Sequence, residues 1–546
     1  MDRVPRRNGR PPERKKRRLR GAGPAFLAAL ALALSSCGEI HERPRLSPPA
    51  SQADRASGKA PRLLQGPMVG FASDREAWVW VRASGPARVR VRYRREGGEE
   101  AADEETSEAV QALPERDHTA VIPLKGLQPG AAYRYRVIVE EEDATGPRKP
   151  FFRTLPPAGR PGRFRVAFGA DVSVDFDPVQ RIWKAVTRAR PDAFLWLGDN
   201  VYTYSADPDD LRAKYRRQRS VEALLDFQAS VPQLAIWGDH DYGHNDSDRR
   251  FRTKDKSQAV FQEYWANPQY GLPGEPGPSK PPVMSQTALA PQTPKASQTA
   301  GMTQTAQTPP AARMPRTPGS PRKRGLPKTS GIYFQWAIGN VDFFFLDSRS
   351  ERDSNSLPDG LMKTQLGFRQ RAWLKAMLKK SRAVFKVLVS SDTWTQRKRI
   401  SKDSWASFLY ERDQIFDFIR DEGIRGVFLI AGDIHRPMMN VLPWSERGGY
   451  DLYETISSPL AQRVIRRPLR EGKFRRLRPP SVFAVNFGLL EFDTAADPAR
   501  VTIHLMDAEG KDLWTPLTLE ADELRPGVRS WDRKLIPPPK REDPRP

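Results

Sequence analysis

The sequence predicts an α/β domain that follows a smaller all-β domain, and three observations support this division. Apolar and polar residues alternate with a period of two between residues 77 and 139, as in half-buried strands. From residue 164 onward, short apolar runs alternate with segments of helical periodicity, which is typical of βαβ units. Three of these apolar runs end in Gly-Asp, so their carboxylates should meet at one edge of a parallel sheet.

The formal net charge of +24 is concentrated in three segments, residues 1–23, 276–329 and 463–478. The rest of the 546-residue chain is close to neutral. The sequence contains no RRM, KH or helix-turn-helix signature, so we expect no specific nucleic-acid partner. Capture of polyanions by the basic segments is an alternative, and it predicts DNA binding that weakens steeply with salt.

The N-terminal residues 1–37 have the parts of an export signal. A basic segment is followed by the apolar run 24–34, which is too short to span a bilayer. Leu34-Ser35-Ser36-Cys37 then resembles the bacterial lipobox, in which the cysteine is lipidated, and Cys37 is the only cysteine of the chain. We therefore expect an extracytoplasmic lipoprotein anchored to a membrane at Cys37. A plain signal peptide is the alternative, and the sequence leaves the export route, Sec or Tat, open.

The composition of the sequence predicts the remaining domain boundaries. Residues 38–61 are polar and aperiodic, as in a tether, and residues 62–156 should form a β-sandwich of immunoglobulin or fibronectin type. The α/β domain is expected at residues 160–515. Within it, residues 276–329 are rich in Pro, Gln and Thr and should be a disordered insertion. Residues 524–546 are rich in Pro and charge and should be a disordered tail.

Periodicity places the individual elements. In the β domain, strands are expected at residues 77–81, 89–93 and 133–139, and Leu127-x-Pro129-Gly130-x-x-Tyr133 resembles the corner of fibronectin type III domains. In the α/β domain, helices are expected at residues 177–189, 211–230, from 366 and at 414–420. Strands are expected at residues 164–169, 193–197, 234–237, 331–336, 341–346, 385–391, 426–430, 487–492 and 501–506.

The strand ends carry the residues with chemistry. Carboxylates and imidazoles follow successive apolar runs: Asp171, Asp199, Asp239, His240, Asp433 and His435. One Gly-Asp pair is a common turn, but three of them after apolar runs are hard to explain as turns alone. Because the carboxyl ends of parallel strands converge in space, we expect a metal site there.

These motifs resemble those of a known superfamily. The resemblance to binuclear metallophosphoesterases rests on Gly198-Asp199, Gly238-Asp239-His240-Asp241 and Gly432-Asp433-x-His435. The chain resembles the PhoD-like alkaline phosphatases more narrowly through Tyr202, Asn245, Leu346-Asp-Ser-Arg349, Leu366-Gly-x-x-Gln-x-x-Trp-Leu and Arg436. The resemblance covers roughly residues 65–270 and 330–510 and implies a layered αββα domain.

The resemblance also implies two metal ions. Asp199 would bridge them, Asp171 and His435 would complete one site, and Asp239 with Asp433 would serve the other. A metal-bound hydroxide would attack phosphorus in line with the leaving oxygen. That oxygen would be stabilised or protonated by His240, with Asp241 holding the imidazole.

Three further residues receive roles from the resemblance. Tyr202 would be an additional ligand, although packing explains a Tyr after a strand equally well. Asn245 would bind a metal or orient a ligand, and Arg349 would clamp the phosphate through its forked donors. For His244 we expect packing only.

The chain departs from the PhoD-like pattern at two strand ends. Gly169-Ala170-Asp171 stands where these enzymes usually carry an iron-binding cysteine. Ser390-Ser391-Asp392 stands where the wider superfamily has a histidine. An oxygen-dominated site favours Ca²⁺, Mg²⁺ or Mn²⁺ over zinc, and iron is a further possibility.

The sequence thus predicts a monomeric, surface-anchored phosphatase acting on phosphoesters outside the cytoplasm. Two alternatives remain open. One is a phosphodiesterase acting on lipid, nucleotide or wall-polymer phosphates. The other is a catalytically inactive member of the family that serves as a surface binding lipoprotein, an alternative that the missing cysteine keeps open.

Overall fold

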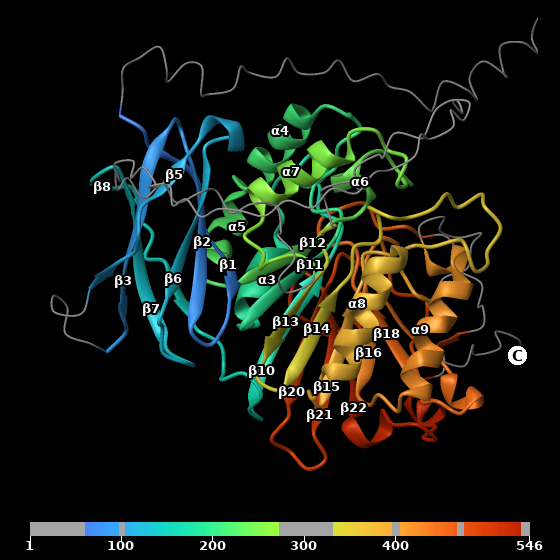
Figure 1. Cartoon of the computed structure of the whole chain (residues 1–546). Coiled ribbons are helices and arrows are strands. Elements are labelled where there is room, and N and C mark those ends of the chain that lie inside the picture. Colours follow the sequence, from blue (N-terminus) through green and yellow to red (C-terminus); the bar gives the residue numbers. More distant parts are fainter. Residues whose placement is uncertain (1–59, 98–103, 272–330, 396–403, 467–473, 537–546) are drawn as a thin grey trace, which may run out of the picture. The chain divides into compact units, whose positions relative to one another are not determined.

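The computed structural model describes residues 60–97, 104–271, 331–395, 404–466 and 474–536 (Figure 1). The predicted signal segment with Cys37, residues 38–59 of the tether, the insertion at 276–329 and residues 537–546 of the tail lie outside these residues. No helix within the described ranges is both long and apolar enough to cross a membrane.

Residues 63–153 form two antiparallel sheets. The first contains β1 (Leu63–Ala72), β2 (Glu76–Ala83) and β6 (Thr119–Lys125). The second is built on β3 (Ala87–Arg95) and β7 (Ala132–Val139), with the short strands β4 (Glu105–Thr106), β5 (Val110–Ala112), β8 (Glu142–Asp143) and β9 (Phe151–Arg153). Val89, Val91 and Tyr93 of β3 are buried while the arginines between them face outward, as the period of two predicts.

The corner expected at residues 127–133 is present. The hydroxyl of Tyr133 accepts a hydrogen bond from the backbone amide of Gln128 at 2.9 Å. The Tyr133 ring stacks on Phe152 of β9, with ring centroids 5.5 Å apart. This tyrosine therefore fixes the turn that enters β7.

The α/β domain begins with a parallel unit. β10 (Arg163–Gly169), β11 (Ala193–Leu197) and β12 (Gln233–Ile236) lie side by side in parallel. The last strands of the chain join the same sheet: β20 (Phe487–Asp493) pairs antiparallel with β10, and β21 (Arg500–Met506) and β22 (Leu517–Glu520) follow. The sheet order is β12-β11-β10-β20-β21-β22, so β10 is an interior strand.

The second sheet is assembled from the middle of the chain. β14 (Val341–Phe345), β15 (Phe385–Val389), β16 (Val427–Ala431) and β18 (Leu452–Ile456) run parallel. β13 (Phe334–Ile338) and β17 (Met438–Leu442) pair antiparallel to this group, and β19 (Arg475–Arg476) forms an edge.

The two sheets pack face to face between helices. Phe492 of β20 contacts Phe343, Phe385 and Phe428 of the second sheet, with ring centroids 5.9–6.4 Å apart. On the outside of the first sheet, Trp183 of α3 (Ile182–Arg188) packs on Trp196 of β11. The outer face of the second sheet carries α8 (Gly367–Lys380) and α9 (Leu409–Asp421) (Figure 1). The layering is therefore α/β/β/α, as predicted.

Three predicted helices have different bounds. The helix expected at 414–420 is longer, because α9 extends from Leu409 to Asp421. The helix expected at 177–189 begins only at Ile182, because the Asp177 side chain accepts from two backbone amides and Gln180 has a left-handed φ of 49°. The helix expected at 211–230 is two helices, α4 (Pro208–Gln218) and α5 (Glu222–Gln228). Between them, Arg219 turns into the core, where its guanidinium lies 4.0 Å from the Trp265 ring centroid.

The predicted disordered tail is wrong for residues 524–536. Leu524 and Ser530 are fully buried. The amide of Ser530 donates to Asp451 at 2.7 Å, and its hydroxyl lies 2.7 Å from that of Tyr453. These polar contacts tie the segment to β18, which composition alone did not indicate.

Candidate metal centre

The predicted site residues follow strands of both sheets. Asp171, Asp199 and Asp239 come directly or nearly directly after β10, β11 and β12. Asp433 and His435 follow β16 of the second sheet. Four of these five residues have left-handed φ angles: 66° at Asp171, 48° at Asp199, 76° at Asp433 and 51° at His435. Such strained backbone at non-glycine residues is concentrated at functional sites.

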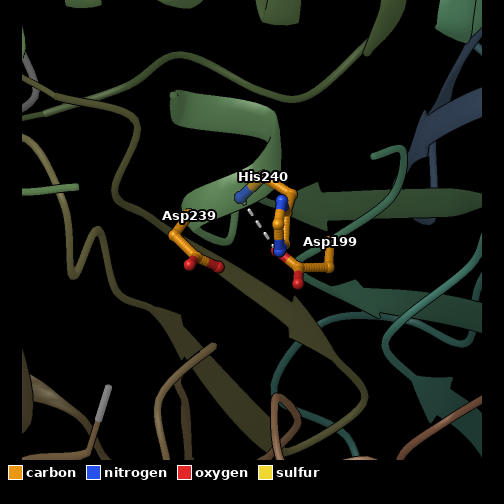
Figure 2. A group of neighbouring side chains, drawn as sticks. All are labelled: Asp199, Asp239 and His240. Atoms are coloured by element: carbon orange, nitrogen blue, oxygen red, sulfur yellow. Dashed lines mark hydrogen bonds between the residues drawn. The ribbon is translucent and has the colours of Figure 1, made fainter. Parts of the chain in front are cut away.

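Three of the residues form a buried cluster that could hold a metal ion. Single ligand atoms of Asp199, Asp239 and His240 all lie within 4.8 Å of one another. Figure 2 shows the two carboxylates and the imidazole side by side, with Asp239 and His240 on α6 (Asp239–Tyr242). The backbone amide of His240 donates to Asp199 Oδ1 at 3.2 Å, which fixes this carboxylate against the start of the helix.

A second group lies around Asp171. Its Oδ1 atom is 3.1 Å from Nε2 of His435 and accepts from the Tyr202 hydroxyl at 2.9 Å. The same hydroxyl lies 3.0 Å from His435 Nε2. Oδ2 accepts from the amide of Asp433 at 3.2 Å. Tyr202 is therefore more than a packing residue, because its oxygen meets two predicted ligands.

The electrostatics connect the two groups. Burial, and then the carboxylates of Asp239, Asp171, Asp241 and Asp433, raise the pKa of Asp199 well above its usual range. So many buried like charges are unfavourable unless positive charge compensates them. The donor set, carboxylates with two imidazoles and a phenol, is one that divalent cations accept. The residues therefore fit a metal centre.

Two glycines leave room for the carboxylates. A Cβ on Gly238 would lie 2.1 Å from Asp199 Oδ1 and 2.7 Å from the Asp199 amide. Gly198 has a φ of 104°, and a Cβ there would lie 2.8 Å from the amide of Gly238. The two Gly-Asp turns are thus packed directly against each other, which is why glycine is required at both positions.

The carboxylate of Asp241 contacts groups other than the imidazole that it was predicted to hold. Its Oδ2 atom accepts from the amides of Gly238 at 3.0 Å and Asn200 at 3.1 Å, and Oδ1 accepts from the Tyr215 hydroxyl at 2.8 Å. Nδ1 of His240 is buried without a hydrogen-bond partner among the described residues, so Asp241 does not orient it. Burial raises the pKa of Asp241 to about 6.

Aromatic rings hold the imidazole of His240 instead. The Tyr202 ring lies against it with centroids 4.4 Å apart, and the Tyr204 ring meets it edge-on at 5.4 Å. Tyr204 is 74% exposed, so the ring lies where the site opens to solvent. Packing, rather than a carboxylate, therefore sets the position of this imidazole.

Arg349, for which the role of phosphate clamp stays a prediction, lies in the interior of the protein. The side chain is fully buried and donates to Asp392 Oδ1 at 2.8 Å. Asp392 also pairs with Arg352, which is equally buried. Asn245 and His244 lie on an exposed loop, next to Asp246, whose amide donates to Asp239 Oδ2 at 2.7 Å. The role predicted for Asn245 stays a prediction.

Ser458 is a site residue that the sequence reasoning missed. Its hydroxyl donates to Asp171 Oδ2 at 2.6 Å and accepts from the His435 amide at 2.7 Å. Burial alone would raise the pKa of Asp171, but His435, Ser458 and Tyr202 lower it below the usual value. The signal was available, because Ser457-Ser458 follows the buried strand β18 in the way that the aspartates follow theirs.

Comparison with known proteins supports the class of fold. The structure entitled Structure of PhoD covers 85% of this chain and 94% of its own, with a TM-score of 0.57 and 16% identity. A purple acid phosphatase from seeds of yellow lupin (Lupinus luteus) covers 88% of this chain and 77% of its own, with a TM-score of 0.50 and 11% identity. The chain thus has a metallophosphoesterase-like α/β fold.

Sequence comparison finds similarity to one phosphatase family over part of the chain. The PhoD-like phosphatase family matches residues 295–480, and a domain of unknown function, DUF7800, matches residues 60–155. Alkaline phosphatase D of Bacillus subtilis (strain 168) is 23% identical over 373 residues, 59% of this chain. The match spans about half of that relative, 54% of its length. The family whose motifs the sequence resembles is thus the one whose model matches residues 295–480 of this chain.

Proposed function

We propose that this chain is a metal-dependent phosphoester hydrolase. The observation that carries the proposal is a group of five carboxylates that follow strands of both sheets. Asp171, Asp239 and Asp241 are buried, Asp433 is half-buried, and all four raise the pKa of the buried Asp199. Such a group is unfavourable as a purely structural feature, because each buried negative charge raises the free energy of its neighbours. The match to the PhoD-like phosphatase family and the similarity to alkaline phosphatase D favour phosphate esters as substrates.

The described side chains suggest how two cations would be held. Asp199, Asp239 and His240 would bind one, with Asp433 nearby. Asp171 and His435, with the Tyr202 oxygen, would bind the other, and Asp199 would lie between the two groups. Bound cations supply positive charge for phosphoryl oxygens and acidify a water molecule that can act as nucleophile.

The protein residues contribute position and proton transfer. The Gly-Asp turns and Ser458 hold the carboxylates in place, and burial of the ligands excludes competing water. His240 is placed to complete the Asp199–Asp239 group, so we propose it as a ligand. Its predicted role as proton donor to the leaving oxygen is the alternative for that imidazole. The donor set favours Ca²⁺, Mg²⁺ or Mn²⁺, with iron as a further option.

The test combines elemental analysis with phosphate release from p-nitrophenyl phosphate and its bis ester. We expect about two metal ions per chain, with activity that a chelator removes and Ca²⁺ or Mn²⁺ restores. The rate ratio of the two esters separates a monoesterase from a phosphodiesterase. Fewer than two ions and no activity after adding Ca²⁺, Mn²⁺ or iron would contradict the proposal and favour an inactive binding lipoprotein.

A matched pair of variants tests the site. Asp199→Asn keeps the shape of the side chain but removes the proposed bridging charge, so kcat should fall by several orders of magnitude, roughly 10³-fold or more. His244→Ala changes an exposed imidazole that lies edge-on to Phe251 and should have little effect. Equal losses in both variants would show that the site is assigned wrongly.

We propose that the enzyme acts outside the cytoplasm, held by a lipid at Cys37. This proposal rests on the lipobox-like Leu34-Ser35-Ser36-Cys37 alone. Cys37→Ser should move the protein from the membrane fraction to the soluble fraction when expressed in a bacterium. Unchanged fractionation would contradict the lipid anchor.

A further inference from the structure

Asp117 of the N-terminal β domain contacts two helices of the α/β domain. It precedes β6, is 7% exposed, and pairs with Arg82 of its own domain at 2.9 Å. Arg216 of α4 also donates to its carboxylate, at 2.8 Å. The hydroxyl of Tyr264, the last residue of α7 (Lys254–Tyr264), donates to the same carboxylate. Both domains belong to the compact unit that spans residues 58–546.

Tyr264 in turn packs on Tyr215 of α4. The two rings are stacked, with centroids 4.8 Å apart and an interplanar angle of 16°, and both side chains are buried. The Tyr215 hydroxyl accepts from Trp265 Nε1 at 3.3 Å and donates to Asp241 Oδ1 at 2.8 Å. Two tyrosines therefore connect a carboxylate of the β domain to one beside the metal centre.

Asp241 ends this series of contacts at the proposed ligands. Its second oxygen accepts from the amides of Asn200 and Gly238. Asn200 directly follows Asp199, and Gly238 directly precedes Asp239. One carboxylate thus fixes the backbone beside two proposed metal ligands on neighbouring strands. A shift of Asp241 would change the spacing of those ligands, and metal affinity is sensitive to such shifts.

We infer that the N-terminal β domain, which matches a domain of unknown function, is a brace for the metal centre, acting through Asp117, Tyr264, Tyr215 and Asp241. Asp117 fixes Tyr264, the ring stack holds Tyr215, and Tyr215 holds Asp241. All four are positioning residues, since none is itself proposed to bind metal or substrate. The inference rests on the proposed metal centre and gives the β domain a role separate from substrate binding.

The test measures Mn²⁺ binding to the full chain by calorimetry, together with the melting temperature in EDTA. Tyr215→Phe removes the hydroxyl that Asp241 accepts from but keeps the ring stack, and should weaken Mn²⁺ binding about tenfold. Tyr264→Phe, one step further from the site, should weaken it roughly threefold. Asp117→Asn tests the end of the series in the β domain and should also weaken binding.

Tyr135→Phe is the matched control. Tyr135 lies in β7 of the same β domain, is buried, and donates its hydroxyl to the carbonyl of Ala229 after α5 at 2.8 Å. Its loss removes a comparable contact between the domains without touching the series. We expect a lower melting temperature in EDTA for this variant but unchanged Mn²⁺ affinity.

A double variant tests whether the contacts act in series. The double variant Tyr215→Phe with Tyr264→Phe should bind Mn²⁺ no more weakly than Tyr215→Phe alone. Tyr264 acts on the metal centre only through Tyr215, so its change has no further effect once the Tyr215 hydroxyl is lost. Additive losses, or equal losses in Tyr135→Phe, would contradict the brace and indicate general destabilisation. Wild-type Mn²⁺ affinity in all the tyrosine variants would overturn it. A wild-type chain that binds no cation would contradict the metal centre itself.

Discussion

Oδ1 of Asp171 lies 3.1 Å from Nε2 of His435, although Asp171 follows a strand of the first sheet and His435 a strand of the second. The Tyr202 hydroxyl lies within 3.0 Å of both atoms. The second half of the proposed centre therefore exists only when the two sheets are packed together. Metal binding should accordingly be a property of the whole α/β domain and stabilise its folded state.

Ser458→Ala should weaken the contact between Asp171 and the segment that carries His435. The hydroxyl donates to Asp171 and accepts from the His435 amide, so its loss leaves a part-buried amide without its acceptor. We expect the free energy of unfolding to fall by about 1–3 kcal/mol. Metal affinity should fall by about 10-fold or more. Calorimetric titration with Mn²⁺ and thermal unfolding measure the two effects.

Ser457→Ala is the control for Ser458→Ala. The Ser457 hydroxyl contacts the carbonyl of Phe168 and the side chain of Asn486, and none of the proposed ligands. It should change stability with little effect on metal affinity. Equal metal affinity in both variants and the wild type would show that Ser458 does not position Asp171.

Gly238→Ala should disrupt the other half of the centre. The new Cβ would lie 2.1 Å from Asp199 Oδ1, so the carboxylate must move. We expect activity on p-nitrophenyl phosphate to fall by about 100-fold, as for a misplaced group at a reacting centre. Gly162→Ala is the control, because nothing lies within 4 Å of its Cβ. Comparable activity in the two variants would contradict the packing of the Gly-Asp turns.

A pH dependence of stability should come from Glu454 in β18. Burial raises its pKa to about 7 from 4.5, and its carboxyl accepts from the Trp394 amide at 2.6 Å. Because the pKa is higher in the folded protein, the stabilisation by the neutral acid is complete below about pH 4.5. It is lost as the pH rises through 7, and amounts to about 3 kcal/mol.

Glu454→Gln isolates this contribution. The amide keeps the shape of the side chain but cannot ionise, so the variant should gain stability relative to the wild type between pH 5 and pH 8.5. Melting temperatures at these two pH values, with and without the substitution, provide the measurement. If the melting temperatures of the two proteins change equally with pH, Glu454 does not change its protonation state between pH 5 and pH 8.5.

The sequence predicted the strands better than the helix ends. Buried parallel strands are apolar on both faces, so runs such as Phe194–Leu197 stand out from their surroundings. Helix bounds were less accurate because side-chain contacts decide them, as at Gln180 and Arg219. Local periodicity also could not predict the pairing of β20 with β10, because it joins segments more than 300 residues apart.

For the site, the sequence predicted which residue types follow the strands, but it did not predict the directions in which their side chains point. Asp171, Asp199, Asp239 and His435 lie where the strand ends predicted. Asp241 is adjacent to His240 in sequence yet points to Gly238, Asn200 and Tyr215, because α6 directs consecutive side chains to different faces. Arg349 was assigned by motif, and only the structure shows that Asp392 holds it in the interior.

The protein should be less stable without its cations than with them. Like charges around Asp199 oppose its ionisation, so the empty centre should destabilise the fold at pH 8 and a bound cation should remove that penalty. Asp199→Asn should therefore melt at a higher temperature than the wild type in EDTA, by roughly 2 °C or more for each kcal/mol of repulsion removed. The variant should also lose the rise in melting temperature that Mn²⁺ gives the wild type.

Thermal scans at pH 8 with EDTA or Mn²⁺ test both expected changes in melting temperature, with His244→Ala as control. The opposite result is an Asp199→Asn variant that melts below the wild type in EDTA and is still stabilised by Mn²⁺. It would mean that hydrogen bonds, and not a cation, compensate the charge of the Asp199 carboxylate.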